Sequence, residues 1–400
     1  MRVLVGVVLL SGALACAGGR PTVTPVPGCD AGRCDWSSLT TLVDSAVAAG
    51  AAPGAVVAVS VRAGRFIHGT GRTGLDDPTI PGPRTIYDLA SLTKVVALTT
   101  GIMIAVDEGR LILDAPIQRW VPEFTGVGKE QVTLRHLLTH SSGLAPFRRL
   151  WLESTSAQEA RDSILATPLD TVPGAQARYS DIGAILLTWA LERAYGTTID
   201  SLMDRRLFGP IGMRSTRYLP PVEWRPLIAP TENDPWRGRV LQGEVHDENA
   251  AWLGGVSGHA GLFGPAEDLL TFGEWVLAGL NRENLNDGNR GTNGRSHRWA
   301  VQPPAALPSF ITVQHLVPES SRALGWDTPS EGSSAGTRLG PRAFGHTGFT
   351  GTSVWIDPDR ELVIVLLTNR VHPTRNNPRV TPLRPAVADQ VAEIVDRPTW

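Results

Sequence analysis

The chain has 400 residues, of which 42% are hydrophobic and 19% are charged, and its formal net charge is −2. This composition is typical of a globular protein and excludes a collagen-like or largely disordered chain. A net charge so close to zero provides no long-range attraction to nucleic acids, so we expect no nucleic-acid partner. Only two of the 37 basic residues are lysines, Lys94 and Lys129, which makes each lysine position informative.

The N-terminal segment has the pattern of an export signal. Arg2 supplies a positive charge, and the apolar run over 3–14 is too short to span a bilayer as a helix. The run ends in Ala13-Leu14-Ala15-Cys16, which fits ordinary signal cleavage and also resembles the bacterial lipoprotein box. We therefore predict a signal peptide over 1–15 and an exported protein, either periplasmic or anchored to the membrane through a lipid on Cys16.

Residues 16–36 are predicted to tether this signal to the folded domain, because the stretch is rich in proline and glycine. Two further cysteines, Cys29 and Cys34, could pair in the oxidising compartment that an exported protein enters. Such a disulfide would close only a small loop, and two unpaired thiols are the alternative. Metal binding by these cysteines is not expected, since no histidine lies near them in the sequence.

The elements of the predicted domain over 37–400 follow from hydrophobic periodicity. A helix is predicted from about residue 36 to Gly50, and "GAVVAVSVRAGRFIHGTG" predicts a hairpin over 54–71 that turns at Ala63-Gly64. Further helices are predicted over 91–108, 132–140, 181–196, 198–208 and 266–280. A polar, mobile loop over 281–298, a hairpin over 352–370 that turns at 357–360 and a helix over 383–395 complete the chain.

This order of elements predicts an α+β fold. The hairpins at opposite ends of the chain would pair into one antiparallel sheet flanked by helices. The segments between them would form a large, mostly helical central region against that sheet. No repeat of fixed period is present, so we expect one domain.

Ser91 and Lys94 lie three residues apart where the predicted helix over 91–108 begins, so their side chains share one face. A serine hydroxyl is a weak nucleophile until a neighbouring base removes its proton. A lysine with a pKa lowered by burial can act as that base, whereas arginine stays protonated. Free N–H groups at the helix start also favour developing negative charge. The pair therefore predicts nucleophilic catalysis, and the alternative is a helix cap beside a solvated lysine.

Further motifs follow in chain order. Tyr179-Ser180-Asp181 opens the predicted helix over 181–196, "TLRHLLTHSSGL" spans 133–144, and His346-Thr347-Gly348 precedes the strand "TSVWIDP". Together with Ser91 and Lys94, these motifs resemble the serine β-lactamases of the class C type and their penicillin-binding-protein relatives. The resemblance covers roughly residues 38–396.

The resemblance implies a role for each motif. Ser91 would be the nucleophile that forms an acyl-enzyme, Lys94 its partner base, and Tyr179 the phenol that relays protons and activates water. The backbone N–H groups of Ser91 and Phe349 would form the oxyanion hole. The substrate-binding residues would be Asp181, His346, Thr347 and Gly348. The resemblance implies no cofactor and no metal.

The chain departs from the family at two of these positions. Asp181 stands where the family has asparagine, and His346 stands where it has lysine. An ionised aspartate donates no hydrogen bond, and its charge favours a protonated Lys94, which shifts the role of base towards the tyrosine. Without the lysine, the pocket lacks a charge that attracts the carboxylate of β-lactams and D-Ala-D-Ala peptides. We therefore expect weak β-lactamase activity and substrates without that carboxylate, unless Arg338 or Arg342 restores the charge.

The stretch "GEVHDENAAWLGGVSGHAGLFGPAEDL" at 243–269 resembles a block in a branch of the family that includes amidases acting on muropeptides. We expect 243–264 to line the active-site rim, because Gly254-Gly255 and Gly258 permit close backbone approach. The absence of HExxH and cysteine spacing favours structural roles over metal binding for several polar residues. These residues are His136, His140, His246, Asp247, Glu248 and His259.

The leading interpretation is an exported serine hydrolase that acts on amide or ester bonds, with peptidoglycan-derived muropeptides as candidate substrates. One alternative is a true β-lactamase or D,D-carboxypeptidase. Another is a non-catalytic cell-wall or penicillin sensor, although a sensor would not need Ser91, Lys94 and Tyr179 together. The ligand is a small molecule or a peptidoglycan fragment in each case, and the sequence does not indicate an oligomeric state.

Overall fold

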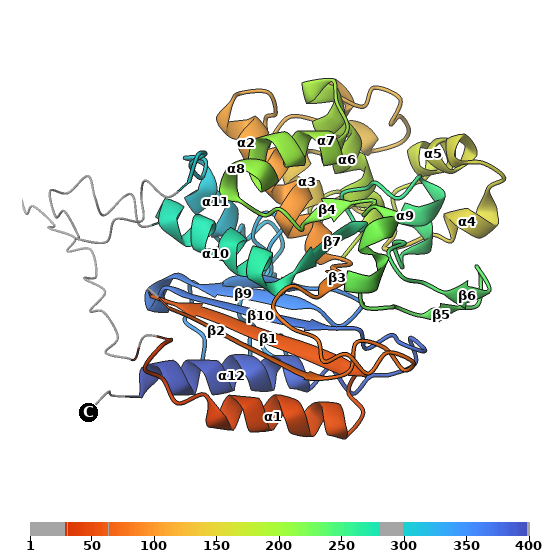
Figure 1. Ribbon diagram of the computed structural model, residues 1–400. Coiled ribbons are helices and arrows are strands. Elements are labelled where there is room, and N and C mark those ends of the chain that lie inside the picture. Colours follow the sequence, from red (N-terminus) through yellow and green to blue (C-terminus); the bar gives the residue numbers. More distant parts are fainter. Residues whose placement is uncertain (1–28, 30, 63, 281–298, 398–400) are drawn as a thin grey trace, which may run out of the picture.

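A five-stranded antiparallel sheet lies at the centre of the computed structural model, which describes residues 29, 31–62, 64–280 and 299–397 (Figure 1). Its order is β2-β1-β10-β9-β8. The strands are β1 (Gly54–Val61), β2 (Gly64–Gly71), β8 (Phe344–Thr347), β9 (Ser353–Asp357) and β10 (Leu362–Thr368). The predicted signal peptide over 1–15, Cys16 and the polar loop over 281–298 lie outside the described residues.

Both predicted hairpins form, and the predicted α+β fold is confirmed. β1 pairs with β2, β9 pairs with β10, and β1 joins the two hairpins by pairing with β10, where Val57 lies opposite Leu366. β1, β9 and β10 are buried along their whole length, which explains their hydrophobic sequences. Periodicity does not predict β8, because its four residues are too few for a readable alternation.

Helices cover both faces of the sheet (Figure 1). α1 (Ser37–Ala48) and α12 (Leu383–Asp396) pack side by side on one face, and α10 (Ala266–Leu280) lies on the other against β1 and β10. Leu39 and Val43, and likewise Val387 and Val391, recur at helical spacing and are buried in one cluster with strand residues. The sheet therefore separates a two-helix layer from the rest of the molecule.

The central region is mostly helical, as predicted. Its helices are α2 (Thr100–Asp107), α3 (Leu134–Leu138), α4 (Leu150–Glu153), α5 (Ala157–Ala166), α6 (Asp181–Tyr195), α7 (Ile199–Met203), α8 (Gly209–Ile211), α9 (Glu248–Trp252) and α11 (Leu307–Ile311). A π-helical segment over Lys94–Thr99 leads directly into α2. The helix predicted over 91–108 thus forms with a widened first part, a feature often found at functional sites.

Short strands that the sequence does not predict form two smaller sheets. β3 (Ile86–Asp88), β7 (Leu262–Pro265) and β4 (Arg217–Tyr218) pair in the order β3-β7-β4, and β5 (Asn233–Asp234) pairs with β6 (Arg239–Val240). Strands of two to four residues carry no periodic signal. The pairing of β3 with β7 brings the segment before Ser91 next to the predicted rim over 243–264.

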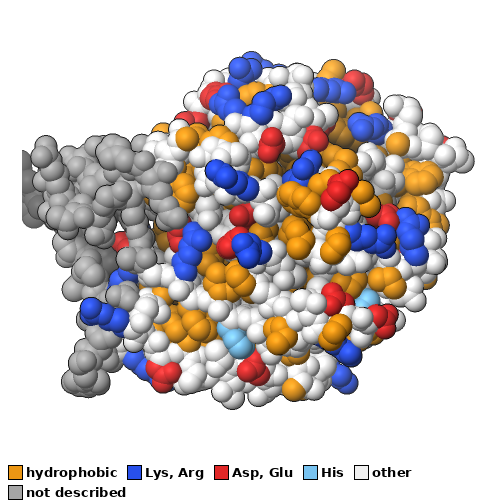
Figure 2. Space-filling model, viewed as in Figure 1, with side chains coloured by type: hydrophobic (Ala, Val, Ile, Leu, Met, Phe, Trp, Pro, Cys, Tyr) orange, Lys and Arg blue, Asp and Glu red, His pale blue; other side chains and the backbone are white. Residues whose placement is uncertain are grey.

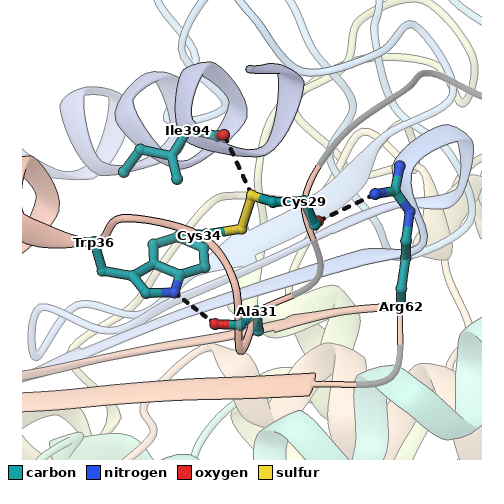
Figure 3. Close-up of a disulfide and its surroundings, with 6 residues drawn as sticks. All are labelled: Cys29, Ala31, Cys34, Trp36, Arg62 and Ile394. Carbon is teal, nitrogen blue, oxygen red and sulfur yellow. Dashed lines mark hydrogen bonds between the residues drawn. A yellow bond between two sulfur atoms is a disulfide. The ribbon is translucent and has the colours of Figure 1, made fainter. Parts of the chain in front are cut away.

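The N-terminal part of the described chain is fastened to the domain (Figure 3). Cys29 and Cys34 form a disulfide, and Cys29 and Trp36 are buried. Trp36 Nε1 donates a hydrogen bond to Ala31 O, and its ring stacks on Phe66 of β2 at a centroid distance of 4.8 Å. The described residues between 29 and 36, which the sequence predicts as tether, therefore pack as part of the folded domain.

None of the described helices is long and apolar enough to cross a membrane. On the face drawn in Figure 2, basic and acidic side chains are interspersed, and no large patch of one sign collects there. This mixture agrees with the net charge of −2 and lacks the basic stripe typical of a nucleic-acid surface.

Candidate active site

A buried carboxylate holds the turn before Ser91. Asp88 ends β3, is 1% exposed, and accepts hydrogen bonds from Ala90 N at 2.8 Å and His246 N at 2.6 Å. Ala90 adopts a φ of 47°, a strained conformation for a residue with a β-carbon. Asp88 thus positions both the turn that presents Ser91 and the segment at 246. No sequence motif singles out Asp88, although it lies only three residues before Ser91.

Lys94 is buried and surrounded by three oxygen atoms. Its Nζ lies 3.1 Å from Ser91 Oγ, 2.9 Å from His259 O and 2.7 Å from Asp181 Oδ1. Burial lowers the pKa of Lys94, but Asp181 and Tyr179 raise it by more, so the pKa lies above the ordinary value for lysine. Lys94 is therefore protonated at neutral pH and donates to Ser91 Oγ.

Tyr179 lies directly before α6, with its ring beside Lys94. The distance from Lys94 Nζ to the ring centroid is 4.9 Å, and Tyr179 Oη is buried without a hydrogen-bond partner among the described residues. Burial raises the pKa of Tyr179, the charge of Lys94 opposes this, and Asp181 adds to it. A buried hydroxyl without a partner is costly. This oxygen is therefore a polar group that a bound substrate could satisfy.

His140 anchors the segment that carries Tyr179. Its Nδ1 accepts a hydrogen bond from Ser180 N at 3.2 Å, and its carbonyl accepts one from Arg178 N at 2.7 Å. The two rings lie 4.5 Å apart between centroids. Burial and nearby positive charges hold the pKa of His140 well below its ordinary value, so Nδ1 remains an acceptor. These contacts agree with the predicted structural role of His140.

The turn between β8 and β9 approaches the Ser91 segment closely because residue 348 is glycine. A β-carbon at Gly348 would lie 2.6 Å from Leu89 O and would also collide with Thr352 Oγ1. Thr352 Oγ1 itself donates a hydrogen bond to Leu89 O at 3.1 Å. A threonine hydroxyl of the turn therefore binds the backbone of the segment before Ser91, and the missing β-carbon at Gly348 lets the two chains approach closely enough for this bond.

The backbone N–H groups of Ser91 and Phe349 are both free of protein acceptors. Neither donates a hydrogen bond to another residue in the described part of the chain. Ser91 and Phe349 line the same two cavities, so both belong to one site. Two N–H groups that line one site and have no protein acceptor within the described chain are available to stabilise an oxyanion, so the predicted oxyanion hole stays a prediction.

His346 lies at the end of β8 and carries no charge. It is 4% exposed, its Nδ1 lies 2.8 Å from Thr347 O, and its Nε2 has no hydrogen-bond partner among the described residues. Burial and the charges of Arg322 and Lys94 lower the pKa of His346 to about 3. His346 is therefore neutral at physiological pH and does not replace the fixed charge of a lysine.

Arginines instead bring positive charge to the site. A cavity of about 440 Å³ beside Ser91 is lined by Arg322, Arg370 and Arg384, together with Thr347. Arg370 Nε donates to the carbonyl of residue 349 at 2.8 Å, and Arg384 Nη2 donates to the carbonyl of residue 352 at 3.1 Å. The prediction of a pocket poor in positive charge is therefore wrong. The prediction failed because these arginines belong to segments that lie far in sequence from any motif.

Arg338 and Arg342, the two arginines that could have restored the positive charge, do not lie beside Ser91. Arg342 pairs with Asp359 at 2.6 Å, and Arg338 lies 3.8 Å from Glu393. Neither lines a cavity that contains Ser91. Proximity in sequence to His346 did not bring them to the site, because each is held by a carboxylate outside both Ser91 cavities.

A second cavity, of about 380 Å³, adjoins Ser91 on its other side. The predicted rim position of 243–264 is confirmed, because four of its residues line this cavity: His246, Asp247, Glu248 and Ala260. The reason predicted for this position, close backbone approach to the rim at the glycines, is not confirmed for Gly258. A β-carbon at Gly258 would meet Thr188 and Leu98, so this glycine serves packing against α6 and the helix that follows Ser91.

His246 and His259 each pair with a carboxylate. His246 Nε2 lies 3.0 Å from Glu232 Oε2, and His259 Nε2 lies 2.9 Å from Asp247 Oδ1. No group of three or more His, Cys, Asp or Glu side chains in the described part of the chain could hold a metal ion. The contacts agree with structural roles for both histidines.

Fold and site together define the class: a serine hydrolase in which a buried lysine contacts the serine at the start of a helix. The chain belongs to the β-lactamase family, because the family model described as Beta-lactamase matches residues 39–389. It is 30% identical over 342 residues to a protein of Salmonella enteritidis PT4 (strain P125109) named "Putative D-alanyl-D-alanine carboxypeptidase". That match covers 78% of this chain and 76% of the relative.

Solved structures share the fold. A β-lactamase/D-alanine carboxypeptidase from Yersinia pestis, complexed with citrate, is 19% identical with a TM-score of 0.65, over 90% of this chain and 99% of that one. A class C β-lactamase from Rhodobacter sphaeroides is also 19% identical with a TM-score of 0.65, over 88% and 98% of the two chains. The resemblance found in the sequence motifs is thus confirmed at the level of family and fold.

Proposed function

We propose that this chain is an exported serine hydrolase that forms an acyl-enzyme on Ser91 and cleaves amide bonds of peptidoglycan-derived muropeptides. The observation that carries the proposal is the distance of 3.1 Å between Ser91 Oγ and Lys94 Nζ, in a site that also holds a buried tyrosine hydroxyl. Export is supported by the sequence of residues 1–16 and by the Cys29–Cys34 disulfide, since disulfides are typical of oxidising compartments.

The proposed reaction uses the phenol as a relay. Ser91 Oγ bonds to the substrate carbonyl carbon while its proton passes to Tyr179 Oη and the proton already on Tyr179 Oη passes to the substrate nitrogen, so the phenol is neutral before and after the step. The C–N bond then breaks, the carbonyl re-forms and the nitrogen leaves as a neutral amine. The N–H groups of Ser91 and Phe349 stabilise the negative oxygen of the intermediate. Water then adds to the acyl carbon, the ester bond to Ser91 breaks, and the hydroxyl is restored. Lys94 acts through its positive charge, which stabilises the negative charge that develops on the oxygens of Ser91 and Tyr179 during these proton transfers.

The arginine-lined cavity changes the expected substrate. Guanidinium groups bind carboxylates well, so Arg322, Arg370 and Arg384 favour a substrate that carries a carboxylate on one side of the scissile bond. The Salmonella relative bears a carboxypeptidase name. D,D-carboxypeptidase action on muropeptides that end in D-Ala-D-Ala is therefore the second candidate function. Ester hydrolysis and hydrolysis of amides without a carboxylate are the competing outcomes.

A matched substrate series tests both candidates on the full mature chain. We expect release of D-alanine from a MurNAc-pentapeptide ending in D-Ala-D-Ala, at least about tenfold slower release from its C-terminal amide, and slow turnover of nitrocefin. Activity and labelling by a fluorophosphonate should both disappear in Ser91→Ala. Turnover of nitrocefin faster than of any peptide would show a β-lactamase instead. Absence of labelling by both fluorophosphonate and fluorescent penicillin would support the sensor and contradict the proposal.

A further inference from the structure

Four aromatic side chains form a continuous row that leads away from the Ser91 site. Phe147 lines the second cavity together with Ser91. From Phe147 the ring centroids follow at 5.8 Å to Trp151, a further 6.1 Å to Trp236 and a further 6.2 Å to Trp252. We call these four residues the aromatic row. Because its first member belongs to the cavity, the row is a direct extension of the candidate active site.

The aromatic row is assembled by tertiary structure from three distant segments. Phe147 and Trp151 lie before and in α4, Trp236 follows β5, and Trp252 ends α9. α4, α9, β5 and β6 gather at one edge of the molecule, on the right in Figure 1. Phe147 is 41% exposed and Trp236 37% exposed. Phe147 therefore presents an apolar face to the cavity that it lines, and Trp236 presents one to solvent further along the row.

Trp236 is held rigidly. The guanidinium of Arg237 lies 5.2 Å from the Trp236 ring centroid, and Arg237 itself is fixed by Asp234 and by the carbonyls of residues 245 and 246. At the far end, Trp252 Nε1 donates to Ser154 Oγ at 2.9 Å. A ring held in this way binds a ligand with little loss of conformational entropy.

The charged groups of the second cavity are already engaged with one another. Asp247 pairs with His259, and Glu248 pairs with Arg375 at 2.7 Å. A charged ligand group would have to break these pairs. The unengaged surface on this side of Ser91 is therefore aromatic, which favours a neutral ligand with flat faces of C–H groups and polar edges.

We propose that the aromatic row binds the saccharide part of a muropeptide, with a sugar ring stacked on Trp151 or Trp236. The C–H face of a sugar carries partial positive charge and packs on the negative face of an indole, while its hydroxyls stay in water. An extended peptide spans about 3.3–3.6 Å per residue. A sugar on Trp151 or Trp236 would therefore be joined to the scissile bond at Ser91 by a peptide of several residues, as in a muropeptide, because two ring-to-ring steps of 5.8 and 6.1 Å already separate Trp236 from the cavity residue Phe147.

This inference rests on the proposed function, and its test separates the two. The kcat/KM would be measured for a MurNAc-pentapeptide and for the same peptide with an acetyl group in place of the sugar. We expect Trp236→Ala and Trp151→Ala to reduce kcat/KM for the sugar-bearing substrate about 5- to 100-fold through KM, as for other stacking contacts. The sugar-free substrate should change less than twofold. Trp120→Ala, at a half-buried tryptophan outside both Ser91 cavities, is the matched control.

Equal losses on both substrates would show that the row only supports the fold of the site, and would overturn the inference. The inference would also be overturned if Trp236→Ala weakened binding of an octanoyl-peptide more than binding of the sugar-bearing peptide. The row would then bind an alkyl chain. Calorimetric binding to Ser91→Ala gives a readout independent of turnover. If no muropeptide is hydrolysed but sugar-dependent binding is lost in Ser91→Ala/Trp236→Ala, the proposed function fails and the saccharide site stands.

Discussion

Asp181 contributes most to keeping Lys94 positively charged, and Tyr179 adds to its effect. The carboxylate lies 2.7 Å from Nζ, and without it burial would favour a neutral amine. The asparagine that the family has at this position carries no charge, so it would leave the lysine free to act as a base. Aspartate instead holds the proton on Lys94. In the proposed relay, Lys94 therefore stabilises developing negative charge and does not itself accept the Ser91 proton.

Replacing Asp181 by asparagine tests which form of Lys94 is active. Asp181 raises the pKa of Lys94, so Asp181→Asn lowers it, and Lys94 loses its proton at a lower pH. If the protonated form is active, the alkaline limb of the pH profile of kcat/KM moves to lower pH, by about 1–3 pH units. The pH dependence of kcat/KM between pH 5 and 11 measures this. A neutral Lys94 acting as base would instead extend activity into the acid range, which would contradict the relay.

At the scale of elements, the turn between β8 and β9 positions the Phe349 N–H group. We expect Gly348→Ala to push this turn away from Leu89 O, because its β-carbon would lie 2.6 Å from that atom. Loss of one oxyanion donor costs about 10²–10³ in kcat. Single-turnover acylation measures the effect. The control is Gly82→Ala, where a β-carbon meets nothing within 4 Å, and which should retain full activity. Normal acylation by Gly348→Ala would refute the role of this turn.

The start of α10 contains a carboxylate that opposes folding at neutral pH. Asp268 accepts hydrogen bonds from Ser215 N and Thr216 Oγ1, both at 2.9 Å, yet burial raises the pKa of Asp268 to about 6. Protonated Asp268 carries no penalty, so its contribution to stability is present below the unfolded pKa of about 4 and is lost as the pH rises through 6.

Asp268→Asn should therefore gain stability relative to the wild type as the pH rises from 4 to 7. The gain is at most about 3 kcal/mol in the free energy of unfolding, since one pKa unit corresponds to about 1.4 kcal/mol. Urea unfolding at pH 4.5 and pH 7.5 measures it, with Asp162→Asn on the exposed side of α5 as control. A difference between the proteins that is the same at both pH values would contradict this assignment.

At the scale of the whole molecule, the central sheet separates the disulfide from the active site. Cys29 and Cys34 belong to the buried cluster of α1 and α12, whereas Ser91 follows β3 on the other side of the sheet (Figures 1 and 3). The bridge also closes a short loop, because five positions separate the two cysteines. Stability and activity should therefore respond differently to its removal.

The double variant Cys29→Ala/Cys34→Ala should lose about 2 kcal/mol or less in the free energy of unfolding, as expected for so short a loop. Its kcat/KM should stay within twofold of the wild type. Thermal unfolding and steady-state kinetics on the same preparation measure both. A large loss of activity in a variant that remains folded would show that the two faces of the sheet are coupled.

The motif residues and the main elements could be predicted from the sequence because their signals are local. The spacing of Ser91 and Lys94 places both on one helical face, and the terminal hairpins have hydrophobic runs long enough to read. Strands of two to four residues have no readable periodicity, so β3, β4, β7 and β8 could not be predicted from the sequence. The pairing of β3 with β7, which places Asp88 opposite Phe263 just before Ser91, was therefore not predicted.

The sequence by itself therefore determined the family and the sheet of terminal hairpins, and it singled out Ser91 as the candidate nucleophile. Only the tertiary structure decided the environment of that serine. Arg322, Arg370 and Arg384 lie in segments separated by up to 62 residues, yet they line one cavity, and the four rings of the aromatic row come from three separate segments. Electrostatic and stacking interactions depend on distances of a few ångströms between side chains. Those distances cannot be derived from the order of these residues in the chain.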